Sequence, residues 1–460
     1  MKGHLNSKFS MYLGKATYKI LKMSGKNGTA LPGKVSIKIE PNLLSEMGNK
    51  CDRIIIVTGT NGKTTINNLL NHVLKGQYKN IASNLNGSNL ISGVVTPFIV
   101  NKQDRYDCGV FEVDEGTVPK VTEQLKPNYI IITNFFRDQL DRYGEVENTI
   151  KMVHDSIKDS KTILILNADD PSSLYFSDLP NKKIYYSHNK TDYSKDNTDV
   201  LESVFCPICG SRLKYDYVNY GNIGEYHCPQ CGIKNPLSDY RLMSVSSHDG
   251  YYDFSIGYCN ERKKFRLNLM GIYNLYNCLA VIALSSELGL SYETIKDRII
   301  SFEYKLGRME NISLTENKEV VLVLSKNPVG LSEVFGAFQV DPNLKSLMFI
   351  LNDYPADGTD ISWIWDANFE RIMKISNIKN FYCSGTRAEE VALRLKYSGF
   401  PEDKIRVYPS KDRFDIETAI NKILLEPYKS YIIGTFTGMP EARKLIYEKK
   451  EVMVNSKGEL

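Results

Sequence analysis

Histidine, tryptophan and long apolar runs are scarce in this 460-residue sequence. None of the 6 histidines lies beyond His248, so the last part of the chain lacks the imidazole that usually activates a cysteine nucleophile. No apolar run approaches the ~20 residues that a bilayer-spanning helix needs. The net charge of +4 is small for this length and does not indicate a nucleic-acid-binding protein.

The length and the composition, with 42% hydrophobic and 24% charged residues, predict a globular protein of two or three domains. Apolar residues alternate with lysines over residues 5–22, which predicts an amphipathic basic helix rather than a signal peptide. We expect this helix to pack on the domain behind it. A helix lying on an anionic membrane surface is the alternative.

Short β-branched runs alternate with helical patterns along the chain, which predicts a mostly parallel sheet covered by helices. A polar stretch at 310–318 suggests a boundary, and a helix is expected from Asn274 to Leu288. The predicted strands of the first part are 53–58, 108–113, 129–133 and 162–166, and those of a second α/β domain are 320–324, 346–351, 380–384, 405–408 and 430–433.

A glycine-rich loop follows the first predicted strand directly and opens a helix. It consists of Gly59, Thr60, Asn61, Gly62, Lys63, Thr64 and Thr65. Backbone N–H groups of such a loop surround phosphate oxygens, and the helix N-terminus adds partial positive charge. Lys63 can reach the β- and γ-phosphates and the Thr64 hydroxyl can ligate Mg²⁺, so the loop predicts an ATP site.

Four of the nine cysteines form two CPxCG pairs separated by 18 residues: Cys206, Cys209, Cys228 and Cys231. This spacing predicts a tetrahedral Zn²⁺ site, which four thiolates would fill completely and make structural. A redox CxxC needs only one pair, at a helix N-terminus, and is the less favoured interpretation. The odd number of cysteines, the CxxC pairs and the lack of an export signal indicate a reducing cytoplasm, with metal binding rather than disulfides.

The loop is shorter than GxxxxGK[ST] and in this it resembles the Mur ligases and folylpolyglutamate synthases. Five further segments resemble this family in the same order. The six are residues 59–65 (GTNGKTT), 111–115 (FEVDE), 133–144 (TNFFRDQLDRYG), 167–170 (NADD), 271–277 (GIYNLYN) and 307–310 (GRME).

The resemblance implies that Glu112 binds Mg²⁺ with Thr64, that Asn274 and Asn277 face the adenine, and that Arg308 approaches the phosphates. Gln139 stands where the family often has a metal-binding histidine, so a second Mg²⁺ site is not predicted. The implied chemistry is carboxylate activation, in which ATP forms an acyl phosphate that an amine then attacks.

A Mur core with an inserted cysteine ribbon resembles the MurT subunits of lipid II isoglutaminyl synthase. Residues 325–330 (SKNPVG), 351–366 (LNDYPADGTDISWIWD) and 384–390 (SGTRAEE) resemble that family's C-terminal motifs. The expected fold class is α/β, a Mur-ligase-like ATP-binding central domain with an inserted four-cysteine zinc ribbon and a Rossmann-like C-terminal domain. The expected boundaries are 1–50 for the N-terminal helix and linker of the central domain, 51–310 for its ATP-binding part, 201–240 for the ribbon and 311–460 for the C-terminal domain.

This resemblance implies amidation of the α-carboxyl of D-glutamate in the lipid II stem peptide, with ATP, Mg²⁺ and structural Zn²⁺. A GatD-like glutaminase would supply ammonia as a heterodimer partner, and the histidine distribution supports a missing glutaminase. We expect a cytoplasmic protein that acts at the inner face of the membrane, with no nucleic acid and at most peripheral membrane contact. The alternatives are a Mur- or folylpolyglutamate-type ligase that joins an amino acid, and an ATP-dependent regulatory protein.

Asp360 has two interpretations. It is placed to cap a helix that begins near Ser362 or Trp363. The resemblance implies instead a catalytic role, in which Asp360 completes the partner's cysteine–histidine pair. Trp363 and Trp365 are expected to be core residues at the helix start, with partner-binding anchors as the alternative.

Overall fold

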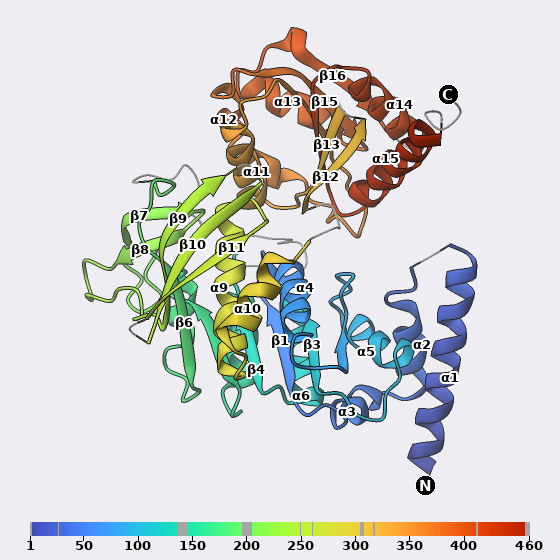
Figure 1. Ribbon diagram of the computed structural model, residues 1–460, viewed down its shortest axis with the longest axis vertical. Coiled ribbons are helices and arrows are strands. Elements are labelled where there is room, and N and C mark those ends of the chain that lie inside the picture. Colours follow the sequence, from blue (N-terminus) through green and yellow to red (C-terminus); the bar gives the residue numbers. More distant parts are fainter. Residues whose placement is uncertain are drawn as a thin grey trace. The chain divides into compact units, whose positions relative to one another are not determined.

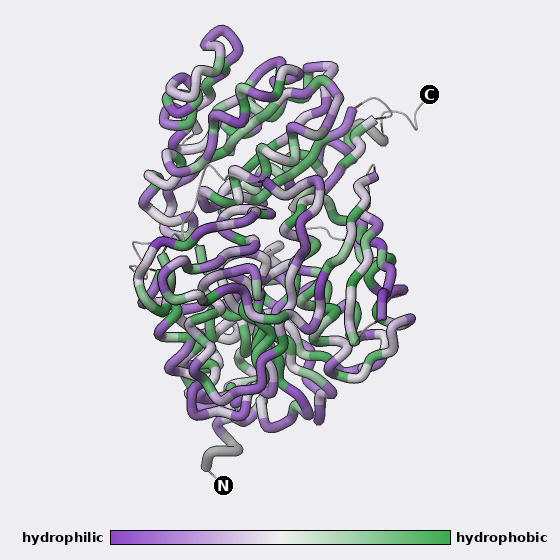
Figure 2. The backbone as a smooth tube through the Cα atoms, turned by 90° about the vertical axis from the view of Figure 1, so that its left-hand side faces the viewer, coloured by the Kyte–Doolittle hydropathy of each residue, from purple (hydrophilic) through white to green (hydrophobic). Residues whose placement is uncertain are grey.

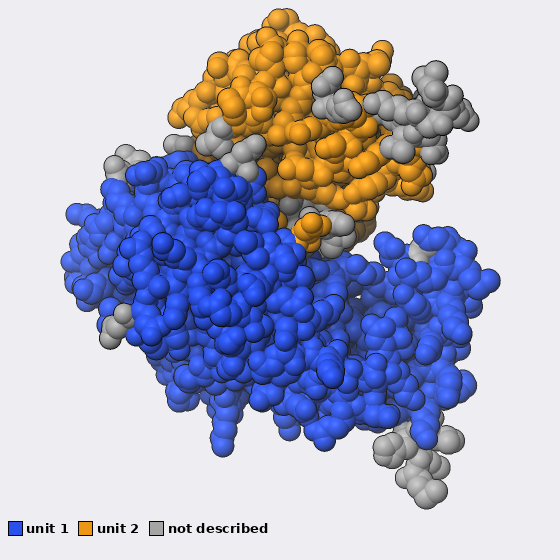
Figure 3. Space-filling view, viewed as in Figure 1, with its two compact units in different colours: residues 1–136, 143–268, 272–302 blue, residues 137–142, 269–271, 303–460 orange. Residues whose placement is uncertain are grey.

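The computed structural model describes residues 2–25, 27–136, 146–195, 205–248, 250–259, 261–303, 308–315, 318–410 and 413–455. These residues form two compact units (Figure 3). Unit 1 contains the described residues up to Phe302 except 269–271, and unit 2 contains 269–271 and the described residues from Glu303 onward. In both units hydrophobic segments gather in the interior (Figure 2).

Within the described residues of unit 1, nine strands form one sheet in the order β11-β10-β9-β6-β5-β4-β1-β3-β2. The strands from β2 to β6 and β9 run parallel, and β9, β10 and β11 form an antiparallel meander. The strands are β1 (Ile54–Thr58), β2 (Ile81–Ser83), β3 (Cys108–Glu112), β4 (Tyr129–Ile132), β5 (Ile163–Asn167), β6 (Lys183–His188), β9 (Tyr240–His248), β10 (Tyr251–Tyr258) and β11 (Glu261–Leu267).

Helices cover this sheet, as the alternating pattern predicts (Figure 1). Ile54 and Ile56 face a core built with α5, α6 and α8, while α4 and α9 pack together elsewhere in the unit. The helices are α1 (Lys2–Met23), α2 (Leu31–Ile39), α3 (Leu43–Gly48), α4 (Lys63–Leu74), α5 (Ile91–Val100), η1 (Glu115–Thr117), α6 (Val118–Leu125), α8 (Val146–Ile157), η2 (Pro171–Phe176), α9 (Ile272–Glu287) and α10 (Tyr292–Ile300). α9 is buried on all sides from Asn274 to Ser285, which explains its apolar sequence.

The cysteine segment lies between β6 and β9 along the chain and forms a separate hairpin of β7 (Lys214–Tyr220) and β8 (Ile223–His227). β6 and β9 are hydrogen-bonded neighbours in the sheet. The hairpin segment is therefore an insertion between adjacent strands. Its small core is shared with η2, because Leu174 packs there with Cys206, Leu213, Tyr226 and Cys228.

The described strands of unit 2 form a sheet in the order β12-β13-β17-β14-β15-β16, parallel except for β12. Successive residues of β14 enter two cores, Leu347 and Phe349 on one face and Met348 and Ile350 on the other. Both faces of this sheet are therefore covered. The elements are β12 (Arg308–Thr315), β13 (Lys318–Leu324), α11 (Pro328–Val340), β14 (Lys345–Ile350), η3 (Ser362–Trp365), α12 (Glu370–Met373), β15 (Ile378–Gly385), α13 (Ala388–Tyr397), η4 (Glu402–Lys404), β16 (Ile405–Pro409), α14 (Arg413–Leu424), β17 (Lys429–Gly434) and α15 (Gly438–Asn455).

The polar stretch near residue 310 is part of the sheet and not a plain linker. β12 pairs antiparallel with β13, and the buried Glu310 carboxylate accepts hydrogen bonds from Arg443 Nε (2.9 Å) and Tyr447 Oη (2.9 Å) on α15. The ion pair with Arg443 therefore explains why a carboxylate is buried at position 310. None of the described helices combines the length and apolar character that crossing a membrane requires.

Candidate active site

The glycine-rich loop joins the end of β1 to the start of α4, as the sequence predicts. Gly59 and Gly62 have φ of +111° and +93°, a region that favours glycine. A Cβ on Gly59 would lie 2.3 Å from Thr133 Oγ1, so the loop also needs glycine for close approach to the chain after β4. Thr64 and Thr65 are buried in the first turn of α4.

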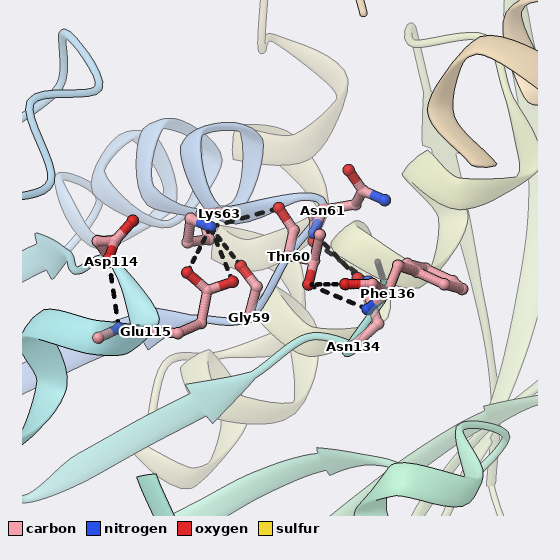
Figure 4. Close-up of polar contacts among 9 residues, drawn as sticks. Gly59, Thr60, Asn61, Lys63, Asp114, Glu115, Asn134 and Phe136 are labelled. Carbon is pink, nitrogen blue, oxygen red and sulfur yellow. Dashed lines mark hydrogen bonds and ion pairs between the residues drawn. The ribbon is translucent and has the colours of Figure 1, made fainter. Parts of the chain in front are cut away.

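Asn134 holds the loop from the neighbouring strand end (Figure 4). Its carbonyl accepts a hydrogen bond from Thr60 N (2.8 Å), and its side-chain oxygen accepts one from Asn61 N (2.9 Å). The Thr60 hydroxyl bonds both the N–H and the carbonyl of Phe136. These contacts fix the loop backbone before any nucleotide binds, which reduces the ordering cost of binding.

Lys63 is buried and its ammonium group lies 3.1 Å from Glu115 Oε2 (Figure 4). It also donates to the carbonyls of Gly59 and Thr60. Because a buried charge needs a partner, Glu115 holds the lysine beside the loop in this structure. Glu115 belongs to the FEVDE segment, but neither its residue type nor the family resemblance predicts this contact. Its position three residues after the strand end was the available signal.

Thr64 and Glu112, the two expected Mg²⁺ ligands, lie near one another. A Cβ on Gly87 would stand 3.8 Å from Thr64 Oγ1 and 4.0 Å from Glu112 Oε2. Asn84 braces the end of β3 by accepting from Glu112 N (2.9 Å) and donating to its carbonyl (2.7 Å). Both oxygens therefore approach the same position beside the loop, and a hydroxyl and a carboxylate are suitable ligands for a hard cation.

The two asparagines that are expected to contact the adenine, Asn274 and Asn277, come from α9, more than 200 residues along the chain. Asn277 Nδ2 donates to Asn274 Oδ1 (3.0 Å), and both side chains are buried. A Cβ on Gly62 would lie 2.3 Å from Asn277 Oδ1, so this amide touches the phosphate loop. The fold therefore brings the two asparagines to the loop.

A buried polar network lies beside these residues. Asp169, from the NADD turn, accepts hydrogen bonds from Tyr276 Oη (2.6 Å) and His188 N (2.7 Å). Burial raises the pKa of the Asp169 carboxyl to about 7, while the hydrogen bond from Tyr276 acts in the opposite direction. Tyr276 lies between Asn274 and Asn277 on α9. The network therefore supports the helix that carries both asparagines.

The four cysteines Cys206, Cys209, Cys228 and Cys231 come together, with all sulfurs within 4.8 Å of one another. The Sγ–Sγ distances are 3.7 Å for Cys206–Cys231 and 3.5 Å for Cys209–Cys228. Four thiolates at ~2.3 Å from one ion would be similarly spaced. Gly210 and Gly232 follow the knuckles with φ of +72° and +74°, which allows the tight turns that aim the sulfurs inward. The cluster could hold one metal ion.

The cysteine hairpin is joined by hydrogen bonds to Tyr276 on α9 and to Asp169. Asn219 on β7 donates to Tyr276 Oη (2.7 Å), and Gly224 N on β8 donates to the Asp169 carbonyl (3.0 Å). Asn235, just after the hairpin, donates to Asp169 Oδ1 (3.2 Å). The sequence could not predict this connection, because Asp169 and Tyr276 lie far from the hairpin along the chain and in different segments.

In unit 2, two of the C-terminal motifs, residues 351–366 and 384–390, meet Thr437 from the segment after β17 at the carboxyl ends of parallel strands. Asn352 accepts from Thr386 N (3.0 Å) and donates to Thr437 Oγ1 (2.9 Å). The Arg387 side chain donates to Asp353 Oδ2 (2.7 Å), and the Thr437 hydroxyl donates to Asp357 Oδ2 (2.6 Å). Functional loops of α/β sheets gather at this edge.

Asp360 lies in the loop between β14 and η3 and is exposed. Its carboxylate accepts from Ser362 N (2.8 Å), and this backbone hydrogen bond lowers its pKa. Ile361, and not Asp360, is the N-cap residue of η3, so Asp360 bonds the first N–H of this helix from one residue further out, and its carboxylate is open to solvent. Trp363 packs against the core of unit 2, whereas Trp365 is 46% exposed and lies edge-on to Tyr397.

Several predicted positions lie outside the described residues. These are Gly307 and most of the TNFFRDQLDRYG segment, residues 137–144, including Gln139. The Arg308 backbone pairs with Val323 in the sheet, but its side chain is outside the described part.

Comparisons with known proteins identify the family of both parts of the chain. Residues 57–285 match the Mur ligase middle domain, and residues 324–439 match the MurT ligase C-terminal domain. The chain is 36% identical over 387 residues to the lipid II isoglutaminyl synthase (glutamine-hydrolyzing) subunit MurT of Staphylococcus aureus (strain COL), covering 84% of this chain and 87% of that protein. It is 33% identical over 457 residues to the same-named subunit of Streptococcus pneumoniae (strain ATCC BAA-255 / R6), covering 98% and 99%.

Solved structures confirm the Mur-ligase-like α/β fold. A pseudomurein peptide ligase type C from Methanothermus fervidus superposes with a TM-score of 0.66 at 20% identity, covering 86% of this chain and 78% of that one. A Mycobacterium tuberculosis folylpolyglutamate synthase superposes with a TM-score of 0.61 at 12% identity, covering 91% and 98%. The chain therefore belongs to the MurT family and is an ATP-dependent ligase.

Proposed function

We propose that this chain is the synthetase subunit of a lipid II isoglutaminyl synthase. It would transfer the γ-phosphate of ATP to the α-carboxylate of D-glutamate in the stem peptide. Ammonia would then attack the acyl phosphate, releasing phosphate and leaving the carboxamide. The observation that carries this proposal is 33% identity over 98% of the chain to a subunit of that name.

The residues around the phosphate loop support the first half-reaction. N–H groups of Gly59 to Thr65 would bind phosphate oxygens, and Lys63 and Arg308 would offset charge on the transferring group. Thr64 and Glu112 would hold Mg²⁺, which supplies positive charge at the phosphates. Asn274 and Asn277 would contact the adenine. For Lys63 to contact a phosphate, it would share its charge between Glu115 and the nucleotide.

The cysteine cluster would hold Zn²⁺ in a structural role, since four thiolates leave no open coordination position. We also propose that unit 2 is a Rossmann-like domain, which its five parallel strands and two covered faces support. The boundaries 1–50, 51–310, 201–240 and 311–460 are retained as proposed domain limits.

Asp360 is proposed to complete the catalytic pair of a GatD-like glutaminase partner in a heterodimer. Its exposed carboxylate supports this role, as does the exposed Trp365–Tyr397 pair on the same unit. Asp360→Asn should abolish amidation driven by glutamine and spare amidation driven by ammonium. Equal loss of both would place Asp360 in the synthetase reaction.

The proposed function is tested with the purified chain, ATP, Mg²⁺ and lipid II, supplied with an ammonium salt or with glutamine. Mass spectrometry of the stem peptide should show conversion of a carboxyl to a carboxamide with ammonium alone. Adding the glutaminase should restore the reaction with glutamine. Ligation of an added amino acid, without amidation, would instead assign the chain to ordinary Mur- or folylpolyglutamate-type chemistry. We propose that the reaction takes place in the cytoplasm at the inner membrane face, where a lipid-linked substrate and ATP would both be accessible.

A further inference from the structure

Helix α1 is held on unit 1 by a face of small residues and by Met11, which enters the core. Ser7, Ser10 and Gly14 are buried, and Ser36 Oγ on α2 donates to the Ser10 carbonyl (2.9 Å). A Cβ on Gly14 would lie 2.2 Å from Ser36 Oγ. Such close contact fixes which side of α1 faces the domain.

The opposite side of α1 is apolar and exposed. Its members are Phe9 (61% exposed), Tyr12 (72%), Leu13 (41%), Ile20 (66%) and Met23 (88%). At 100° per residue, these positions fall within an arc of about 120°, so they form one continuous strip. Burial in unit 1 cannot explain this strip, because the small-residue face already makes that contact.

A row of lysines borders the strip. Lys8, Lys15, Lys19 and Lys22 are exposed and lie along one flank of α1. The sequence contains no aspartate or glutamate before Glu40, so no acidic residue of the helix offsets their charge. An apolar strip beside a basic row on a helix is the arrangement that suits a surface of anionic lipid.

We propose that α1 is a docking surface for an anionic bilayer, lying parallel to it with the apolar strip inserted and the lysines among the headgroups. The helix does not have the apolar character needed to cross a membrane. This inference rests on the proposed function for its purpose, since a lipid-linked substrate lies in the bilayer. A second copy of the chain would bring its own lysine row to the contact, and a protein partner would need an acidic surface to match the lysines.

The test measures flotation of the full chain with vesicles of phosphatidylglycerol and phosphatidylcholine, against vesicles of phosphatidylcholine alone. Binding should require the anionic lipid and weaken with salt. The double variant Lys15→Gln/Lys19→Gln should bind about 25-fold more weakly, at about fivefold per lysine. Phe9→Ser/Ile20→Ser should weaken binding about tenfold or more.

Matched controls change equally exposed residues elsewhere in unit 1. Leu237→Ser, at a site 88% exposed, and Lys102→Gln/Lys120→Gln should bind vesicles as the parent does. All variants should keep the parent melting temperature and the amidation of detergent-solubilised substrate, which separates docking from folding and chemistry.

The inference is overturned if the parent does not bind anionic vesicles at low salt, or if the α1 variants bind as well as the controls do. It is also overturned if the α1 variants change only the oligomeric state or glutaminase binding. Amidation in detergent without vesicle binding would refute this docking surface and leave the proposed function standing. Vesicle binding without amidation would refute the proposed function and leave the docking surface standing.

Discussion

Gly62→Ala isolates the contact between the phosphate loop and helix α9. Gly62 has φ of +93°, which costs an alanine about 1–2 kcal/mol. Its new methyl group would lie 2.3 Å from Asn277 Oδ1 and would force that amide to move. Losing the Asn277–Asn274 hydrogen bond adds about 1 kcal/mol. Gly62→Ala should therefore lower the free energy of unfolding by about 2–3 kcal/mol and raise the KM for ATP.

Urea unfolding of three further variants separates the cost of backbone strain at Gly62 from the cost of losing the Asn277–Asn274 hydrogen bond. Gly289→Ala is the control for backbone strain, because Gly289 has φ of +83° and its Cβ would meet nothing within 4 Å. It should cost about 1–2 kcal/mol. In an Asn277→Ala background, Gly62→Ala should cost about 1 kcal/mol less than it does in the parent. The reasoning is wrong if Gly62→Ala costs no more than Gly289→Ala, or if the double-mutant cycle shows no coupling.

Three other outcomes are expected. The purified chain should contain about one zinc per chain by mass spectrometry of the metal, and Cys228→Ser should lower both zinc content and melting temperature. Tyr276→Phe should cost about 1.5–3 kcal/mol in urea unfolding and raise the KM for ATP, because Asp169 loses a donor. The Asp169 pKa is raised from 3.8 to about 7 in the folded chain, so this group's contribution to stability falls as pH rises through that window. Asp169→Asn should remove that fall, and an unchanged pH dependence of unfolding would contradict the assignment.

Local sequence patterns were sufficient to predict many of the strands, helices and turns of this protein. The strand, glycine loop and helix from residue 53 to Leu74 are contiguous, so backbone propensity and the needs of a phosphate loop can be read directly. The cysteine knuckles are also local, and the positive φ of Gly210 and Gly232 follows from their sequence. The two α/β units and the parallel order of most strands followed from alternating strand and helix patterns.

Only the tertiary structure could decide contacts between distant segments. It placed Asn277 against Gly62 and Glu115 against Lys63, and it linked the cysteine hairpin to α9 through Asp169 and Tyr276. It also showed that the polar stretch near Glu310 is a strand, whose buried carboxylate is paired by Arg443 and Tyr447 from α15. The physical reason is the same in each case. Propensity acts over a few neighbouring residues, whereas the partner of a buried charge or a close-packed glycine is chosen when segments far apart in the chain pack together.

The N-terminal helix shows both contributions. Its amphipathic, lysine-rich sequence by itself determined that a helix would form and what its faces would carry. The sequence left open which face would be buried, since both packing on the domain and lying on a membrane were compatible with it. Close contact at Gly14 and Ser36 decided the matter by burying the small-residue face. Small residues allow backbones to approach where larger side chains cannot, so the apolar strip was left in solvent.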